Sequence, residues 1–184
     1  MIRSYKTEGI IIKRRNSGEL DRILTVLTRR DGKIQVKAPG VRKLTSRRSS
    51  HIELLNLSML TLYKSSRGFF PIVTEAQSQE EFLPIKRTLE KIGLAYYVCE
   101  LADSLCPENQ ENIRVFNLVK EALYRLAGKL KDNFFVSDFE DKLLVTLGFL
   151  PESHKVEDRQ GFIENILERK LRTKRLLPLF LNEF

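Results

Sequence analysis

The hydrophobic period of this chain changes once, near residue 80, from a two-residue repeat to steps of three and four residues. A two-residue repeat is typical of strands, and residues 33–38 alternate strictly between polar and apolar side chains. The Asp31-Gly32 pair just before them predicts a hairpin turn. Other β-branched or alternating runs predict strands over residues 9–12, 23–28, 55–63 and 69–74. Five short strands are too few for a sandwich, so they favour a small closed or partly open barrel.

After residue 80 the apolar residues recur at helical spacing. The first predicted helix has an apolar face that consists of Ile85, Leu89, Ile92, Tyr96, Cys99, Ala102 and Cys106. Further helices are predicted over residues 113–130, 135–147 and 162–171. Gly148 is expected to stop the third helix, and the last is expected to end before Pro178. The predicted fold class is α+β, with a five-stranded barrel in residues 1–80 and an α-helical bundle in residues 81–184.

The positive charge of the chain is concentrated in the predicted barrel. The formal net charge is +8 and the isoelectric point is near 9.6. Residues 1–80 hold 16 Lys and Arg against 7 Asp and Glu, whereas residues 81–184 hold 16 against 17. Such a surplus favours a polyanionic partner, either nucleic acid or an anionic surface. The alternative is a protein that is merely basic.

The sequence argues against several classes of protein. No apolar run approaches the ~18–20 residues that span a bilayer, and the N-terminus has no apolar stretch of signal-peptide length. We therefore expect no membrane partner and a cytoplasmic location. Phosphate-binding loops, dinucleotide fingerprints and hydrolase motifs are missing, so we predict that the chain is not an enzyme and takes no cofactor. Two cysteines and two histidines cannot form a four-ligand zinc site without carboxylates, so no metal is expected.

Two pairs of residues in the helical half have a reactive and a structural interpretation. Asp138 and Glu140 could be a carboxylate pair for a nuclease metal, but side chains two positions apart on a helix point to different faces. We therefore expect both to be solvated charges. Cys99 and Cys106 lie on the predicted apolar face, where buried core thiols are more common than redox or metal roles.

The strongest binding signal is the stretch over residues 39–50. It carries four cations and several hydroxyls but no acidic residue, which suits contacts to phosphates. Lys33 and Lys37 are expected on one outward face of the preceding strand. The candidate phosphate-binding residues are Lys13, Arg14, Arg15, Lys33, Lys37, Arg42, Lys43, Arg47 and Arg48. The alternative is an ordinary solvated run of charges.

Aromatic residues near this stretch are candidates for stacking on unpaired bases. They are Tyr63, Phe69 and Phe70. If the strand over residues 69–74 is regular, at least one of the two phenylalanines must face inward.

A second basic cluster occupies residues 169–175, near the end of the last predicted helix. Cations there could simply complement the helix dipole. They could also form a docking site for an acidic peptide or a second nucleic-acid strand. The candidate partner-binding residues are Arg169, Arg172, Lys174 and Arg175.

Several motifs follow one another in order along almost the whole chain. In the first half they are Glu8–Arg15, Gly18–Leu24, Leu27–Lys33, and Gly40–Lys43 leading to Ser46-Arg47. In the second half they are Leu143-Leu144 with Leu147-Gly148-Phe149-Leu150-Pro151, and Lys170–Leu177. In order and spacing these motifs resemble the RecO family of bacterial DNA repair and recombination mediators.

The resemblance implies an N-terminal OB-fold and a C-terminal helical domain. It also implies binding to single- and double-stranded DNA and annealing of complementary strands. RecR and the acidic C-terminal tail of single-stranded-DNA-binding protein are the implied partners in loading RecA. By the same resemblance, the nine candidate phosphate-binding residues become candidate DNA-binding residues. The rival hypothesis is an OB-fold adaptor that binds RNA or protein and has no annealing activity.

The sequence departs from the family pattern at one place. Family members commonly insert a four-cysteine zinc module between the Gly-Phe-Leu-Pro segment and the last helix. Here only residues 151–160 occupy that gap, and they contain no cysteine. We interpret the chain as a shortened form without the zinc module.

Overall fold

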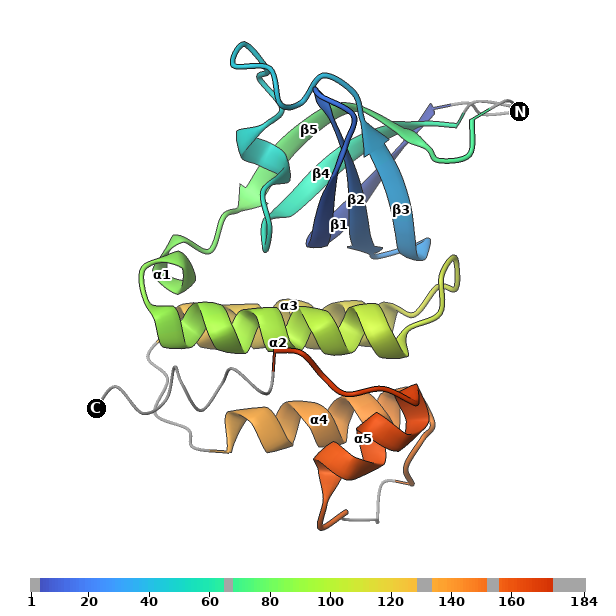
Figure 1. The fold of residues 1–184 in the computed structure, drawn as a ribbon, viewed down its shortest axis with the longest axis vertical. Coiled ribbons are helices and arrows are strands. Elements are labelled where there is room, and N and C mark those ends of the chain that lie inside the picture. The colour runs from blue at the N-terminus through green and yellow to red at the C-terminus, as the bar shows by residue number, and fades with distance from the viewer. Residues whose placement is uncertain (1–3, 65–67, 129–133, 152–155, 174–184) are drawn as a thin grey trace. The chain divides into compact units, whose positions relative to one another are not determined.

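The structure is a computed structural model that describes residues 4–64, 68–128, 134–151 and 156–173 (Figure 1). Its contacts divide the chain into two compact units. The first contains residues 1–81 and 107–116, and the second contains residues 82–106 and 117–184. In the described ranges no helix is long and apolar enough to cross a membrane.

The first unit is a closed barrel of five strands (Figure 1). They are β1 (Ser4–Ser17), β2 (Asp21–Thr28), β3 (Gly32–Ala38), β4 (Leu57–Tyr63) and β5 (Ile72–Glu80). Their order around the barrel is β1-β2-β3-β5-β4, and the β3–β5 pair is parallel while the others are antiparallel. This is the OB-fold arrangement. The predicted fold class is therefore confirmed, with an OB-fold barrel followed by helices.

Strand β1 closes the barrel because it pairs with two neighbours. Residues 4–10 pair with β4, and residues 9–17 pair with β2. The pairing with β2 shifts register between Ile11 and Lys13, just after the end of the pairing with β4. Such a shift is expected of a β-bulge, which bends a strand. The barrel interior is filled by the apolar side chains of the alternating runs. They include Ile11, Leu24, Val26, Ile34, Val36, Leu60, Leu62 and Val73.

Strand β5 begins later than the sequence predicts. The expected strand over residues 69–74 starts instead at Ile72 and continues to Glu80. Pro71 lacks an N–H donor, so a strand boundary beside it is reasonable. Phe69 and Phe70 therefore precede the strand, so the condition under which one of them had to face inward, a regular strand over residues 69–74, is not met. Phe69 is 94% exposed.

A segment from beyond the barrel strands completes the first unit. The Asn109 N–H donates to the Lys33 carbonyl at 2.8 Å, and the Gln35 amide donates to the Glu108 carboxylate at 2.7 Å. The backbones of Glu108 and Lys33 also form an isolated parallel β-bridge. Lys33 is only 7% exposed as a result, so the expectation of an exposed cation at this position is wrong. Strand periodicity carries no information about such a contact, because it joins residues far apart in the chain.

The helices are α1 (Leu83–Lys86), α2 (Leu89–Leu105), α3 (Ile113–Ala127), α4 (Phe135–Thr146) and α5 (Arg159–Leu167). The predicted first helix is thus two helices separated at Arg87 and Thr88. Gly148 follows α4 with a φ of 80°, and its N–H donates to the Val145 carbonyl at 3.0 Å, so the predicted helix stop is confirmed. The last helix ends at Leu167, earlier than predicted, and Pro178 lies outside the described residues.

The predicted apolar face of α2 is wrong in part. Leu89 is 51% exposed and Tyr96 is 43% exposed. The buried residues are instead spread around the helix: Gly93, Leu94, Ala95, Tyr97, Val98, Cys99, Leu101, Ala102 and Leu105. A helix that is covered on most sides has no single apolar stripe, so helical periodicity does not identify its exposed side.

The predicted solvation of Glu140 is also wrong. Glu140 is 2% exposed, and its carboxylate accepts a hydrogen bond from the Tyr97 hydroxyl. Asp138 is half-buried and pairs with Arg125 at 2.6 Å and with Lys142 at 2.9 Å. The expected burial of Cys99 and Cys106 is confirmed, and burial raises the pKa of the Cys99 thiol to about 12.

Candidate nucleic-acid interface

The basic stretch after β3 is a loop folded by its own backbone. Gly40 has a φ of 64°, and its carbonyl accepts the Lys43 N–H at 3.2 Å. The Lys43 carbonyl accepts the Ser46 N–H at 2.9 Å. The Asp21 carboxylate fixes the start of the loop, because it accepts the Gly40 N–H at 2.8 Å. The cations of the loop are therefore presented from a defined backbone.

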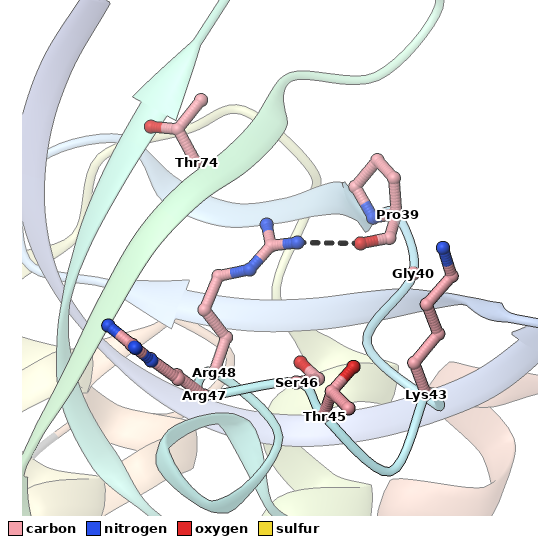
Figure 2. Close-up of a pocket in the computed structure, with 8 residues that line it drawn as sticks. All are labelled: Pro39, Gly40, Lys43, Thr45, Ser46, Arg47, Arg48 and Thr74. Carbon is pink, nitrogen blue, oxygen red and sulfur yellow. Dashed lines mark hydrogen bonds between the residues drawn. The ribbon is translucent and has the colours of Figure 1, made fainter.

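Two of the loop arginines hold this backbone in place. The Arg48 guanidinium donates to the Pro39 carbonyl at 2.7 Å (Figure 2). It also donates to the Val73 carbonyl on β5. Arg42 donates to the carbonyls of Glu19 at 2.6 Å and Gly18 at 3.2 Å. Both arginines therefore join the loop to its neighbours.

A pocket of about 530 Å³ lies between this loop and β5. Figure 2 shows Arg48 between Arg47 and Lys43, with the hydroxyls of Thr45 and Ser46 nearby. The lining residues are Pro39, Gly40, Lys43, Thr45, Ser46, Arg47, Arg48 and Thr74. This set provides three cations and three hydroxyls, and it contains no acidic residue. Such a combination can neutralise a phosphate and donate hydrogen bonds to its oxygens.

Lys43 and Arg47 are the exposed cations of the pocket. Arg47 makes no hydrogen bond or ion pair within the described part of the chain. The hydrogen bond from the Gly40 N–H, and then that from Lys37, hold the pKa of Asp21 below its ordinary value. The positive charges of Lys37 and Lys43 both act on the Asp21 carboxylate and lower its pKa as well. These two lining residues are therefore the best placed to meet a phosphate.

The other predicted residues have different surroundings. Lys37 pairs with Asp21 at 3.0 Å. Glu53 pairs with Arg14 and also accepts from Arg22 at 2.9 Å. Lys13 and Arg15 are exposed on β1. The structure thus gathers three of the nine candidates in the pocket, Lys43, Arg47 and Arg48, and it joins Lys37 to the base of the loop through Asp21.

Sequence reasoning missed the residues that complete or limit this surface. Thr74 lines the pocket from β5, and only the closed barrel brings it to the loop. Glu53 lies just beyond the basic stretch, so its negative charge could have suggested that it pairs with a nearby cation. Its choice of Arg14 and Arg22 depends on the fold. Within the described ranges, no group of three or more His, Cys, Asp or Glu side chains could hold a metal ion.

The second basic cluster lies beyond α5 and is not helical where the structure describes it. Glu168 adopts a φ of 52° just after the helix. Arg169 and Arg172 therefore lie just beyond the helix and not within its last turn. Arg169 lies 3.8 Å from Glu100, and Arg172 is exposed. Lys174 and Arg175 lie outside the described residues.

The Glu100 carboxylate binds the backbone of this cluster. Its carboxylate accepts the Arg172 N–H at 2.8 Å and the Thr173 N–H at 2.7 Å. Burial raises the pKa of Glu100, but these hydrogen bonds outweigh burial and the net pKa lies below its ordinary value. The carboxylate therefore fixes the backbone while the Arg172 side chain stays exposed.

A closed five-stranded barrel with a cationic pocket on its surface, followed by helices, defines an OB-fold protein. The family model described as "Recombination protein O N terminal" matches residues 1–80, and "Recombination protein O C terminal" matches residues 86–156. The chain belongs to the RecO family of DNA repair proteins.

Curated relatives named DNA repair protein RecO support this assignment. That of Roseiflexus sp. (strain RS-1) is 39% identical over 153 residues, which are 83% of this chain and 53% of the relative. That of Dehalococcoides mccartyi (strain CBDB1) is 36% identical over 148 residues, 80% of this chain and 58% of the relative. That of Pelotomaculum thermopropionicum is 33% identical over 157 residues, 85% of this chain and 60% of the relative. The chain spans between half and three-fifths of the length of these relatives.

Proposed function

We propose that this chain is a non-enzymatic, cytoplasmic DNA repair and recombination mediator. It binds single- and double-stranded DNA, anneals complementary strands, and helps RecR to load RecA on DNA covered by single-stranded-DNA-binding protein. In this proposal residues 1–80 bind DNA, and residues 81–184 contact partner proteins through the basic cluster at Arg169, Arg172, Lys174 and Arg175. The observation that carries the proposal is the cationic pocket of the barrel, which has hydroxyls and no acid in its lining.

The proposed mechanism is neutralisation of phosphate charge. Two complementary strands repel each other, and a cationic surface lowers this repulsion when it holds both of them. Counterions released from the strands supply much of the affinity, so binding weakens as salt rises. With four to six phosphate contacts on a single strand, the logarithm of affinity is expected to fall against the logarithm of salt with a slope of about −3 to −4.

Removing the two exposed cations of the pocket tests this mechanism. In Lys43→Ala/Arg47→Ala, the salt slope on single strands is expected to become shallower by about 1.4, because two phosphate contacts are lost. Binding should weaken for all base sequences alike, since phosphates carry no sequence information. Annealing of two dye-labelled complementary strands is followed by energy transfer across a salt series.

The matched control removes the same charge elsewhere on the barrel. Lys6 and Arg30 are both exposed and neither lines the pocket. Lys6→Ala/Arg30→Ala should keep most of the annealing rate at a given salt concentration. Equal losses in the two variants would show that only net charge matters and would contradict the assignment of the pocket. Binding without any annealing, or tighter binding to structured RNA, would favour the RNA- or protein-binding adaptor.

Glu53→Gln is expected to increase DNA affinity several-fold at low salt. The substitution releases Arg14 and Arg22 from their shared carboxylate, so two more cations become available to phosphates. Glu75→Gln is the control, because it changes net charge equally at a carboxylate that accepts from the Thr61 hydroxyl at 2.9 Å, a bond that the glutamine oxygen can keep. Affinity is measured by fluorescence anisotropy of a labelled oligonucleotide. Equal gains in both variants would mean that the Arg14 region makes no specific contribution.

A further inference from the structure

Phe69 and Phe70 form an aromatic pair just before β5, in which Phe69 is exposed and Phe70 is half-buried. Their ring centroids are 5.1 Å apart and the rings are nearly perpendicular, with an interplanar angle of 82°. Phe69 is 94% exposed and is the most exposed aromatic side chain in the described part of the chain. Water contact with an entire phenyl ring is unfavourable, so such a ring is a candidate for contact with a ligand.

The aromatic pair adjoins the strand that forms the wall of the cationic pocket. The Pro71 carbonyl accepts the Lys37 N–H at 2.8 Å, which places the start of β5 against the end of β3. Further along β5, the Val73 carbonyl accepts from Arg48, and Thr74 lines the pocket. Phe70 precedes Thr74 by four positions, so the Cα atoms of these two residues lie within about 13 Å of each other even along an extended chain.

This combination selects one kind of ligand. The three cations of the pocket disfavour a basic peptide and favour a polyanion. A polyanion that also carries flat apolar rings at regular intervals is a nucleic-acid strand. In a duplex, the faces of the bases are covered by their neighbours, so only an unpaired base can cover the ring of Phe69.

We propose that Phe69, supported by Phe70, is a stacking platform for an unpaired nucleobase of a strand whose phosphates contact the pocket. This inference rests on the proposed function and deepens it, because it names a strand with unpaired bases as the ligand of this part of the surface. Phosphate contacts alone distinguish single strands from duplexes only by their charge density. The platform adds a preference for unpaired bases that does not depend on their sequence.

The chain contains no tryptophan, which allows a direct test of stacking. In Phe69→Trp, the single indole should lose fluorescence when an oligo-dT strand is added, because a stacked base quenches it. A blunt-ended duplex of two strands with the same number of phosphates should leave the fluorescence nearly unchanged. Phe134→Trp is the matched control, since Phe134 is 74% exposed and belongs to the helical unit. Its fluorescence should not respond to oligo-dT.

Phe69→Leu tests whether the ring face contributes to affinity. Leucine keeps an apolar side chain but cannot stack, so affinity for oligo-dT should fall about tenfold while affinity for the blunt-ended duplex is retained. Equal affinity of Phe69→Leu and the unsubstituted chain for oligo-dT would overturn the proposal. So would an indole signal that changes with protein concentration without DNA, which would indicate contact with a second copy of the chain.

The failure of the platform and the failure of the proposed function give different results. If Phe69→Leu binds oligo-dT normally but Lys43→Ala/Arg47→Ala weakens both DNAs, the platform is wrong and phosphate binding stands. If only the Phe69 substitution weakens binding, the pocket is wrong and the platform alone is supported. If neither variant weakens binding to either DNA, both are wrong.

Discussion

Gly32→Ala is expected to lower the free energy of unfolding by about 3 kcal/mol, for two separate reasons. The first is conformational, because Gly32 has a φ of 67° in the left-handed region. A side chain at such a position costs about 1–2 kcal/mol. The second is steric, because a Cβ at Gly32 would lie 1.9 Å from the backbone oxygen of Gln110.

The steric cost is large because the obstacle is backbone rather than a flexible side chain. The segment over residues 107–116 would have to move away from β3 to accept the methyl group. That movement would lengthen or break the hydrogen bonds that join Asn109 to Lys33 and Glu108 to Gln35. Each such bond contributes about 1 kcal/mol net, and unpaired buried groups would add to the loss.

Gly18→Ala separates these two causes. Gly18 has a φ of 64°, almost the same as Gly32, but a Cβ there would meet no atom within 4 Å. It should therefore cost only the conformational part, about 1–2 kcal/mol. Unfolding of both variants is followed by circular dichroism in urea. Equal destabilisation by the two substitutions would show that the segment over residues 107–116 does not pack against Gly32.

The parts of the fold that depend on local pattern could be predicted from the sequence. Alternation over residues 33–38 and the Asp31-Gly32 turn are properties of neighbouring residues, and both identify β3 and its hairpin correctly. The packing of residues 107–116 on β3 joins residues more than seventy positions apart, so no periodicity contains it. The exposed side of α2 was likewise unpredictable, because it depends on what surrounds the helix.

The candidate site shows the same division between local and distant information. A run of cations without acidic residues is visible in the sequence, and it led to the loop that lines the pocket. The sequence does not show that Arg48 donates to backbone carbonyls or that Glu53 binds Arg14. These contacts form between segments that only the closed barrel brings together. The run of cations therefore indicated a candidate surface, and tertiary structure decides which of its charges are already paired with other groups of the protein.

Tyr97→Phe is expected to lower the free energy of unfolding by about 2–3 kcal/mol. Tyr97 is 1% exposed, and its hydroxyl donates to the buried Glu140 carboxylate. The phenylalanine ring fills nearly the same space, so the packing of α2 should survive. The carboxylate, however, loses one donor in a place that water does not reach. Hydrogen bonds to charged groups are stronger than neutral ones, and leaving such a group short of a partner costs its lost solvation as well.

The pH dependence of this difference gives an independent check. Burial, and then the charge and hydrogen bond of Glu140, raise the pKa of Tyr97 far above its ordinary value. In the unfolded chain this hydroxyl releases its proton near pH 10, while in the folded chain it does not. The unfolded state therefore binds fewer protons above pH 10, and the contribution of Tyr97 to stability decreases as pH rises. The difference in the free energy of unfolding between the unsubstituted chain and Tyr97→Phe should therefore become smaller as the pH rises above 10.

Tyr124→Phe is the matched control for both measurements. Tyr124 belongs to the same helical unit and is 47% exposed, and its ring packs edge-to-face on Phe82 at 5.0 Å, a contact that phenylalanine preserves. Removing an exposed hydroxyl should change the free energy of unfolding by no more than about 0.5 kcal/mol. Urea unfolding curves at neutral pH and above pH 10 supply the values. If Tyr97→Phe is as stable as Tyr124→Phe at neutral pH, the Tyr97 hydroxyl does not stabilise the buried Glu140 carboxylate. In that case the helical unit depends on packing alone at this position.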